Sequence, residues 1–89
     1  METRISTRIP KMEFKNLLKD PKWRNVHGVA DKDNCKVILH NKINQRNLLE
    51  VLIHEHIHCA FYDASEYAVQ RIAGTIADRL WELGYRRVK

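Results

Sequence analysis

The feature that most constrains this sequence is an apolar run at residues 48–62, LLEVLIHEHIHCAFY, which contains neither proline nor glycine. Its length and composition predict a buried helix. Within the run, His54, Glu55 and His58 form the pattern H-E-x-x-H. Four residues turn an α-helix through about 400°, so the two imidazoles are expected on one face, one above the other. Three polar side chains in a buried helix need partners, because unpaired polar groups in a core cost several kcal/mol.

Two imidazoles at this spacing can ligate one zinc ion, and an adjacent carboxylate can take a proton from water held by that ion. The motif therefore predicts a hydrolytic Zn²⁺ site with His54 and His58 as ligands and Glu55 as the general base. The alternative is a set of core histidines whose ring nitrogens bond backbone carbonyls. His56 falls on the opposite side of the helix and is left out of the site.

Length and composition predict one domain, residues 1–89, with a modest core. The 44% of hydrophobic and 30% of charged residues are ordinary for a soluble globular protein. No apolar run is long enough to span a membrane and no signal-peptide core is present, which predicts a cytoplasmic protein, in the host cytoplasm if it is phage-encoded. The two cysteines are expected to be free thiols, since they are too few for a disulfide framework.

The net charge of +5 is concentrated near the two ends of the sequence. Basic ends can contact nucleic acid or an acidic partner, and they also serve solubility. No basic stripe interleaved with stacking aromatic residues is visible, so nucleic acid is only a secondary candidate as a partner.

The segments before the motif predict a small sheet. Alternation indicates a strand over residues 2–9, and Pro10 can open a short helix over residues 11–19. Two further strands are expected at residues 23–30 and 35–40, joined by a polar turn. With the helices, these segments predict an α+β fold with a small antiparallel sheet of about three strands.

Several single residues have expected roles at the ends of these elements. Gly28 is expected at a bulge or a point of close approach, and Asn44 or Asn47 at the start of the motif helix. A second helix is expected to begin at a capping box of Asp63 and Glu66 and to end at Gly84. Its expected apolar stripe is Val69, Ile72, Ala73, Ile76, Leu80 and Leu83.

A catalytic zinc site needs a third protein ligand besides an open position. Of the four carboxylates after His58, Asp78 and Glu82 point away from the apolar stripe. Glu66 lies on the side of the second helix that faces the motif helix, so it is the expected third ligand. Asp63 is the alternative ligand, and Glu66 can also serve only as a helix cap.

The stretch 48–86 resembles the C-terminal half of small zincin-type metallopeptidases, including compact phage and bacterial proteins of the SprT-like and ImmA/IrrE-like groups. The resemblance rests on the H-E-x-x-H helix, an acidic residue at the start of the next helix, and the ending L-W-E-L-G at residues 80–84. It implies a minimal zincin-like domain in which His54, His58 and Glu66 bind zinc and Glu55 is the catalyst, as in gluzincins. The spacing from His58 to Glu66 is shorter than in those families.

The resemblance implies hydrolysis of peptide bonds in a protein or peptide substrate. An edge strand can hold an extended peptide, and so short a chain suggests a narrow substrate range or a partner that completes the cleft. Two other functions remain open. One is a non-catalytic, zinc-stabilised interaction protein that binds a host or regulatory partner, and the other is a protease acting near nucleic acid. The candidates for stabilising the oxyanion are Tyr62, Tyr67, Tyr85 and His27.

Overall fold

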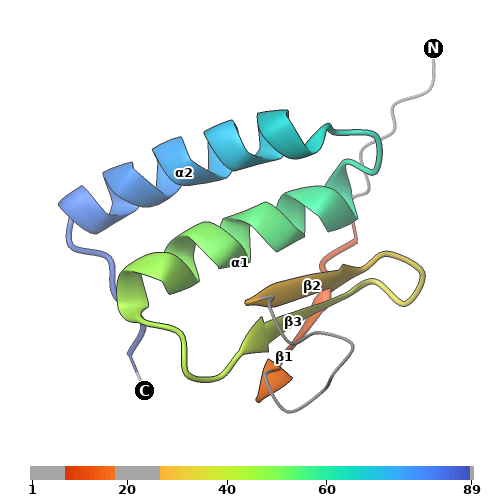
Figure 1. Cartoon of the computed structure of the whole chain (residues 1–89), viewed down its shortest axis with the longest axis horizontal. Coiled ribbons are helices and arrows are strands. Elements are labelled where there is room, and N and C mark those ends of the chain that lie inside the picture. The colour runs from red at the N-terminus through yellow and green to blue at the C-terminus, as the bar shows by residue number, and fades with distance from the viewer. Residues whose placement is uncertain (1–7, 18–26, 89) are drawn as a thin grey trace.

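The computed structural model describes residues 8–17 and 27–88. Its elements in chain order are β1 (Lys11–Lys15), β2 (Gly28–Asp31), β3 (Lys36–His40), α1 (Gln45–Ala60) and α2 (Glu66–Glu82). The strands form one sheet, α1 packs on that sheet, and α2 runs antiparallel to α1 on its other side (Figure 1). The predicted α+β class, with a small sheet and two C-terminal helices, is confirmed.

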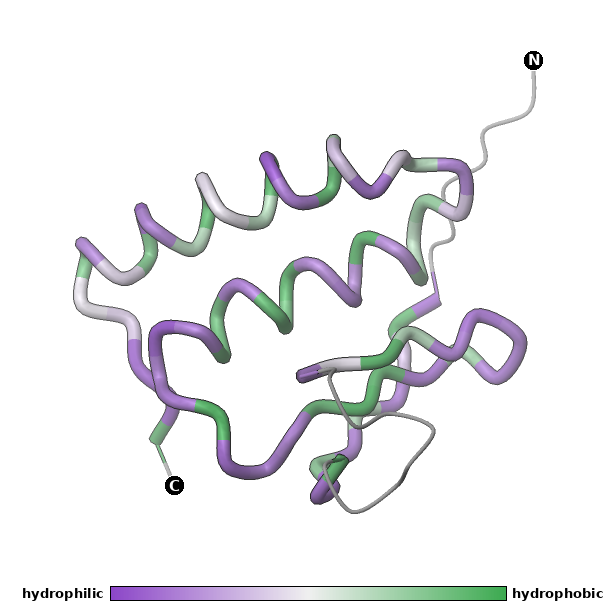
Figure 2. The backbone as a smooth tube through the Cα atoms, viewed as in Figure 1, coloured by the Kyte–Doolittle hydropathy of each residue, from purple (hydrophilic) through white to green (hydrophobic). Residues whose placement is uncertain are grey.

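The sheet is mixed, in the order β1-β3-β2, and is not the antiparallel meander that the sequence predicts. β2 and β3 form the expected antiparallel hairpin, whereas β1 pairs parallel with β3. The hairpin turn is held by Asp31, whose side chain accepts hydrogen bonds from the backbone of Asn34 at 3.2 Å and from its side-chain amide at 2.8 Å. This turn is hydrophilic and the middle of β3 is hydrophobic (Figure 2).

The short helix predicted over residues 11–19 is wrong, because Lys11–Lys15 form β1. Met12 and Phe14 alternate with polar residues and lie beside Val37 and Leu39 in the parallel register. A five-residue segment of this composition is compatible with either a short helix or a strand. Pairing with the free edge of β3 stabilises the strand. Figure 1 shows β1 on the outer side of β3.

The other strand predictions have different outcomes. The one at residues 35–40 is confirmed as β3. The one at residues 23–30 overlaps β2, which begins at Gly28 within the described part of the chain. The one at residues 2–9 falls mainly outside the described residues, and residues 8–10 have no regular structure.

The core lies between the sheet and α1. Its buried members are Val37, Leu39, Leu48 and Cys59, with relative exposures of 6% or less. The helix that covers them begins as expected at Asn44, whose side chain accepts a hydrogen bond from the backbone of Asn47 at 2.8 Å. Because α1 is covered by the sheet on one side and α2 on the other, its apolar side chains extend around much of its circumference.

The second helix begins at Ser65, not at the predicted capping box of Asp63 and Glu66. The Ser65 hydroxyl accepts a hydrogen bond from the backbone of Ala68 at 3.1 Å, and Glu66 is the first residue of the helix. Gly84 follows the helix with a φ of 92°, which confirms its expected role at the C-terminus.

The buried stripe of α2 differs from the predicted one. Val69, Ala73 and Ala77 are fully buried, whereas Ile72 and Ile76 are 48% and 43% exposed. The two alanines let the helix backbones approach closely, so the line of contact follows the i, i+4, i+8 row. The isoleucines lie beside that line and remain partly in solvent.

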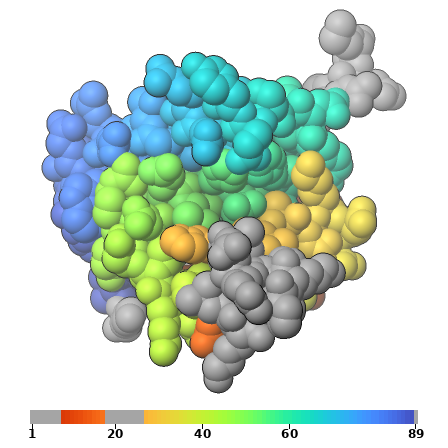
Figure 3. Space-filling model, in the orientation of Figure 1, coloured from red at the N-terminus to blue at the C-terminus, as the bar shows by residue number. Residues whose placement is uncertain are grey.

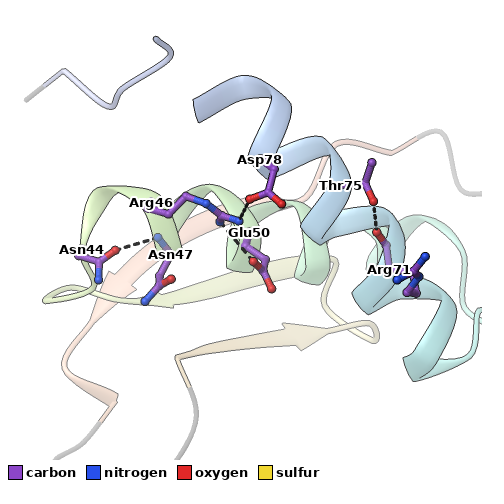
Figure 4. A network of polar contacts seen from close by, with 7 residues as sticks. All are labelled: Asn44, Arg46, Asn47, Glu50, Arg71, Thr75 and Asp78. Carbon is purple, nitrogen blue, oxygen red and sulfur yellow. Dashed lines mark hydrogen bonds and ion pairs between the residues drawn. The ribbon is translucent and has the colours of Figure 1, made fainter. Parts of the chain in front are cut away.

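Polar contacts on the surface link the two helices. Arg46 of α1 bonds Glu50 one turn further along at 3.2 Å and also bonds Asp78 of α2 (Figure 4). Asp78 was expected to point to solvent, and its side chain is 72% exposed. Because these side chains lie at the surface and are between 27% and 72% exposed, the network contributes little to stability, on the order of 1 kcal/mol or less.

Candidate metal centre

Three side chains from α1 and α2 form one group of possible metal ligands: His54, His58 and Glu66. His54 Nε2 lies 2.8 Å from one carboxylate oxygen of Glu66, and His58 Nε2 lies 3.0 Å from the other. The two Nε2 atoms are 3.2 Å apart. The histidine side chains are 16% and 15% exposed, and that of Glu66 is 66% exposed. This half-buried cluster can hold a metal ion.

The spacing of these atoms agrees with a tetrahedral ion. Ligand atoms about 2.0–2.1 Å from a tetrahedral zinc are about 3.3 Å from one another. The distance of 3.2 Å between the two imidazole nitrogens is close to that value. Two ring nitrogens and a carboxylate, all of which carry lone pairs that can bind a metal, converge at hydrogen-bond distance. A single metal ion could bind both ring nitrogens and the carboxylate at the same time.

Local structure explains how the three residues meet. His54 and His58 are one turn apart on α1, and their rings pack edge to face with centroids 4.8 Å apart. The short connection of residues 61–65 reverses the chain, so the first residue of α2 lies opposite the end of α1 (Figure 1). Because Ser65 caps α2, Glu66 is not needed for capping, and its carboxylate reaches both histidines.

Glu55 lies beside this group, packed against β2. A Cβ built on Gly28 would come within 2.9 Å of Glu55 Cγ and 2.5 Å of Val51 Cγ1, so only glycine fits there without a shift. This confirms Gly28 as a point of close approach. Burial raises the pKa of the Glu55 carboxyl group, although the adjacent imidazoles of His54 and His58 oppose the shift.

The metal-ligand group lies in a shallow cleft between β2 and the two helices. The cleft consists of two adjoining hollows that share four residues, Gly28, His54, Glu55 and Glu66. One hollow extends to His27, Glu50 and Gln70, and the other extends along Val29 and Ala30 to Lys32. Among the described strands β2 is at an edge of the sheet, so its outer edge forms one wall of the cleft.

The other predicted site residues have different positions. His56 is outside the group, and its Nδ1 lies 2.7 Å from the Leu52 carbonyl. Asp63, the alternative ligand, is also outside the group. Of the four candidates for oxyanion stabilisation, only His27 lines the cleft. Tyr85 lines a separate apolar hollow beside β1.

Three polar residues of the cleft were not anticipated from the sequence: Lys32, Glu50 and Gln70. Nothing in their sequence neighbourhood marks them, because each is a common surface residue in a turn or on a helix. Only the packing of β2 and α2 against α1 brings them beside the metal ligands.

Comparison with known proteins finds no matching family model, no matching curated protein and no matching solved structure. The case for a function therefore rests on the residues of the cleft and their geometry.

Proposed function

We propose that this protein is a zinc-dependent peptidase with Glu55 as its general base. The observation that carries the proposal is the convergence of His54, His58 and Glu66 within 4.8 Å, beside the partly buried carboxylate of Glu55. Three protein donors leave a tetrahedral ion one open position, which is the arrangement of catalytic zinc sites. The H-E-x-x-H pattern supplies the base next to the first ligand.

The roles of the protein residues follow from their chemistry. When bound by such donors, zinc activates water and polarises a substrate carbonyl. Glu55 accepts a proton from the attacking water on its carboxylate and delivers it to the leaving amine. Burial raises the pKa of this group, so it holds the proton more readily than an exposed glutamate would. Of the four residues considered for oxyanion stabilisation His27 is the one that lines the cleft, so we assign it the hydrogen bond to the developing oxyanion.

The outer edge of β2 supports a peptide as the substrate. Backbone groups on an edge strand can pair with an extended chain, and this one borders the ligands and Glu55. The cleft is shallow, so an extended backbone is a better match for it than a compact folded surface.

A zinc-stabilised interaction protein without activity has less support. Structural zinc sites are closed by four protein ligands, whereas the group here has three among the described residues. Ferrous iron also binds two histidines and a carboxylate, so the identity of the metal has to be measured. Nothing in the described lining of the cleft favours nucleic acid, because Lys32 is the only Lys or Arg among those residues.

The test is metal analysis combined with cleavage of a mixed peptide library, followed by mass spectrometry. The purified protein is expected to hold about one zinc per chain and to cleave peptides. Glu55→Gln is expected to keep the zinc and lose activity by a factor of about 10²–10⁴. Zinc-loaded protein that cleaves no peptide, or Glu55→Gln with wild-type activity, would overturn the proposal.

A further inference from the structure

We propose that Lys32 selects substrates that carry a carboxylate at its end of the cleft. The inference rests on the proposed function, because it concerns the specificity of the same site. Lys32 is the only Lys or Arg among the described residues that line the two hollows. At the opposite end the lining includes Glu50. Lys32 thus places a positive charge at one end of the cleft and Glu50 a negative charge at the other, with the metal ligands and Glu55 between them.

The position of Lys32 is fixed by the hairpin turn that follows β2. Both Asp31–Asn34 hydrogen bonds close this turn, and Cys35 after it has a φ of 50°. The Lys32 ammonium donates a hydrogen bond to the Tyr62 carbonyl at 3.4 Å. The turn thus reaches the connection between α1 and α2, and Figure 3 shows these two parts of the chain in contact.

An ammonium group in this position is available to a ligand. It carries three N–H donors, and the Tyr62 carbonyl uses one of them. Of the two carboxylates that line the same hollow, Glu66 is bonded to both histidines. Tyr62 is the only hydrogen-bond partner of the Lys32 ammonium within residues 8–17 and 27–88, so a substrate carboxylate can accept hydrogen bonds from the two remaining donors without displacing a described partner.

The direction in which a peptide pairs with β2 decides which part of it reaches Lys32. β2 runs from Gly28, beside the His27 and Glu50 end, towards Lys32. A peptide that pairs antiparallel with β2 enters at Lys32 and leaves at the other end. Its carboxylate would then be an acidic side chain on the N-terminal side of the cleaved bond. A parallel peptide would instead offer an acidic side chain on the C-terminal side, or its free C-terminus.

The experiment uses hexapeptides of one alanine-leucine sequence that carry Glu, Gln or Lys at a single position in either half, with amidated or free C-termini. Binding is measured by fluorescence anisotropy with the zinc-loaded Glu55→Gln variant, and cleavage is measured with the protein that retains Glu55. Glu peptides are expected to bind about two- to fivefold more tightly than Gln peptides, as one exposed ion pair allows. High salt should remove this preference. The peptide set that shows the preference (Glu in the N-terminal half, Glu in the C-terminal half, or a free C-terminus) identifies which carboxylate binds Lys32.

Lys32→Gln should abolish the preference, and Lys32→Glu should reverse it in favour of Lys peptides. Lys42→Glu is the matched control, because Lys42 is exposed, lines neither hollow and carries the same charge change. Binding without charge preference, a preference that survives Lys32→Glu, or an equal loss in Lys42→Glu overturns the inference. Lys32-dependent binding without cleavage would instead reject hydrolysis and leave the inference standing. Cleavage without charge preference would support hydrolysis and reject the inference about Lys32.

Discussion

Gly28 of β2 lies directly against Glu55 of α1: a Cβ on the glycine would be 2.9 Å from Glu55 Cγ and 3.3 Å from Glu55 Oε2. The edge strand that forms one wall of the cleft and the proposed base are thus in van der Waals contact. The glycine lets the strand approach the helix, and the strand removes the carboxylate from solvent. A change at position 28 is therefore expected to alter the position and the burial of the Glu55 carboxylate.

Gly28→Ala is expected to displace Glu55 and Val51, because the new methyl group would overlap both side chains. Overpacking of this kind lowers the free energy of unfolding by about 1–3 kcal/mol. Zinc should remain, since the metal ligands are not touched, while peptide cleavage should fall. Chemical denaturation, metal analysis and cleavage assays measure the three effects.

The matched control is Gly74→Ala. Apart from the chain neighbours and the backbone of the same helix, no atom of the described residues lies within 4 Å of a Cβ at position 74 in the interior of α2. This substitution should raise stability by about 0.5–1 kcal/mol, because alanine is the better helix former. If both substitutions have the same effect on stability or cleavage, the contact between Gly28 and Glu55 is not significant.

Glu66 and Ser65 are adjacent, yet the structure gives them separate tasks. Glu66→Gln should weaken zinc binding, because it removes an anionic donor from between the two imidazoles. Ser65→Ala should leave zinc affinity unchanged and lower stability by about 1 kcal/mol, as expected for loss of a helix N-cap. Competition with a chromogenic chelator reports zinc affinity, and thermal unfolding reports stability. Unchanged zinc affinity in Glu66→Gln would remove Glu66 from the ligand set.

The three histidines of α1 should respond differently to alanine substitution. His54→Ala or His58→Ala should abolish stoichiometric zinc binding and remove the stabilisation that bound metal contributes to the fold. His56→Ala should keep the metal, because its ring bonds the Leu52 carbonyl and lies outside the ligand group. Metal analysis after dialysis distinguishes them. Loss of zinc from a folded His56→Ala protein would contradict the ligand assignment.

The cysteines should react slowly in the folded protein. Cys35 and Cys59 are 6% and 3% exposed, and burial raises the pKa of the Cys59 thiol. A raised pKa means that less thiolate is present at any given pH, so alkylation of Cys59 should require a higher pH than in the unfolded chain. Intact-mass measurement of iodoacetamide labelling, with and without guanidinium chloride, tests this. Equal rates in both conditions would show that Cys59 is not protected.

The sequence alone determined the parts of this protein that depend on local spacing. The i, i+4 separation of His54 and His58 puts both rings on one helix face whatever surrounds the helix, and an amide at Asn44 or a glycine at Gly84 acts through its own backbone neighbours. The α+β class, β3 and both C-terminal helices follow from the same kind of local pattern.

The tertiary structure decided what depends on distant partners. Residues Lys11–Lys15 form a strand because β3 offers an edge to pair with, which five residues of sequence cannot reveal. The buried row of α2 passes through Ala73 and Ala77, since close helix packing selects small residues over the isoleucines. The position of Lys32 in the cleft depends on how the hairpin turn packs against the α1–α2 connection, and such long-range packing leaves no periodic signal in the sequence.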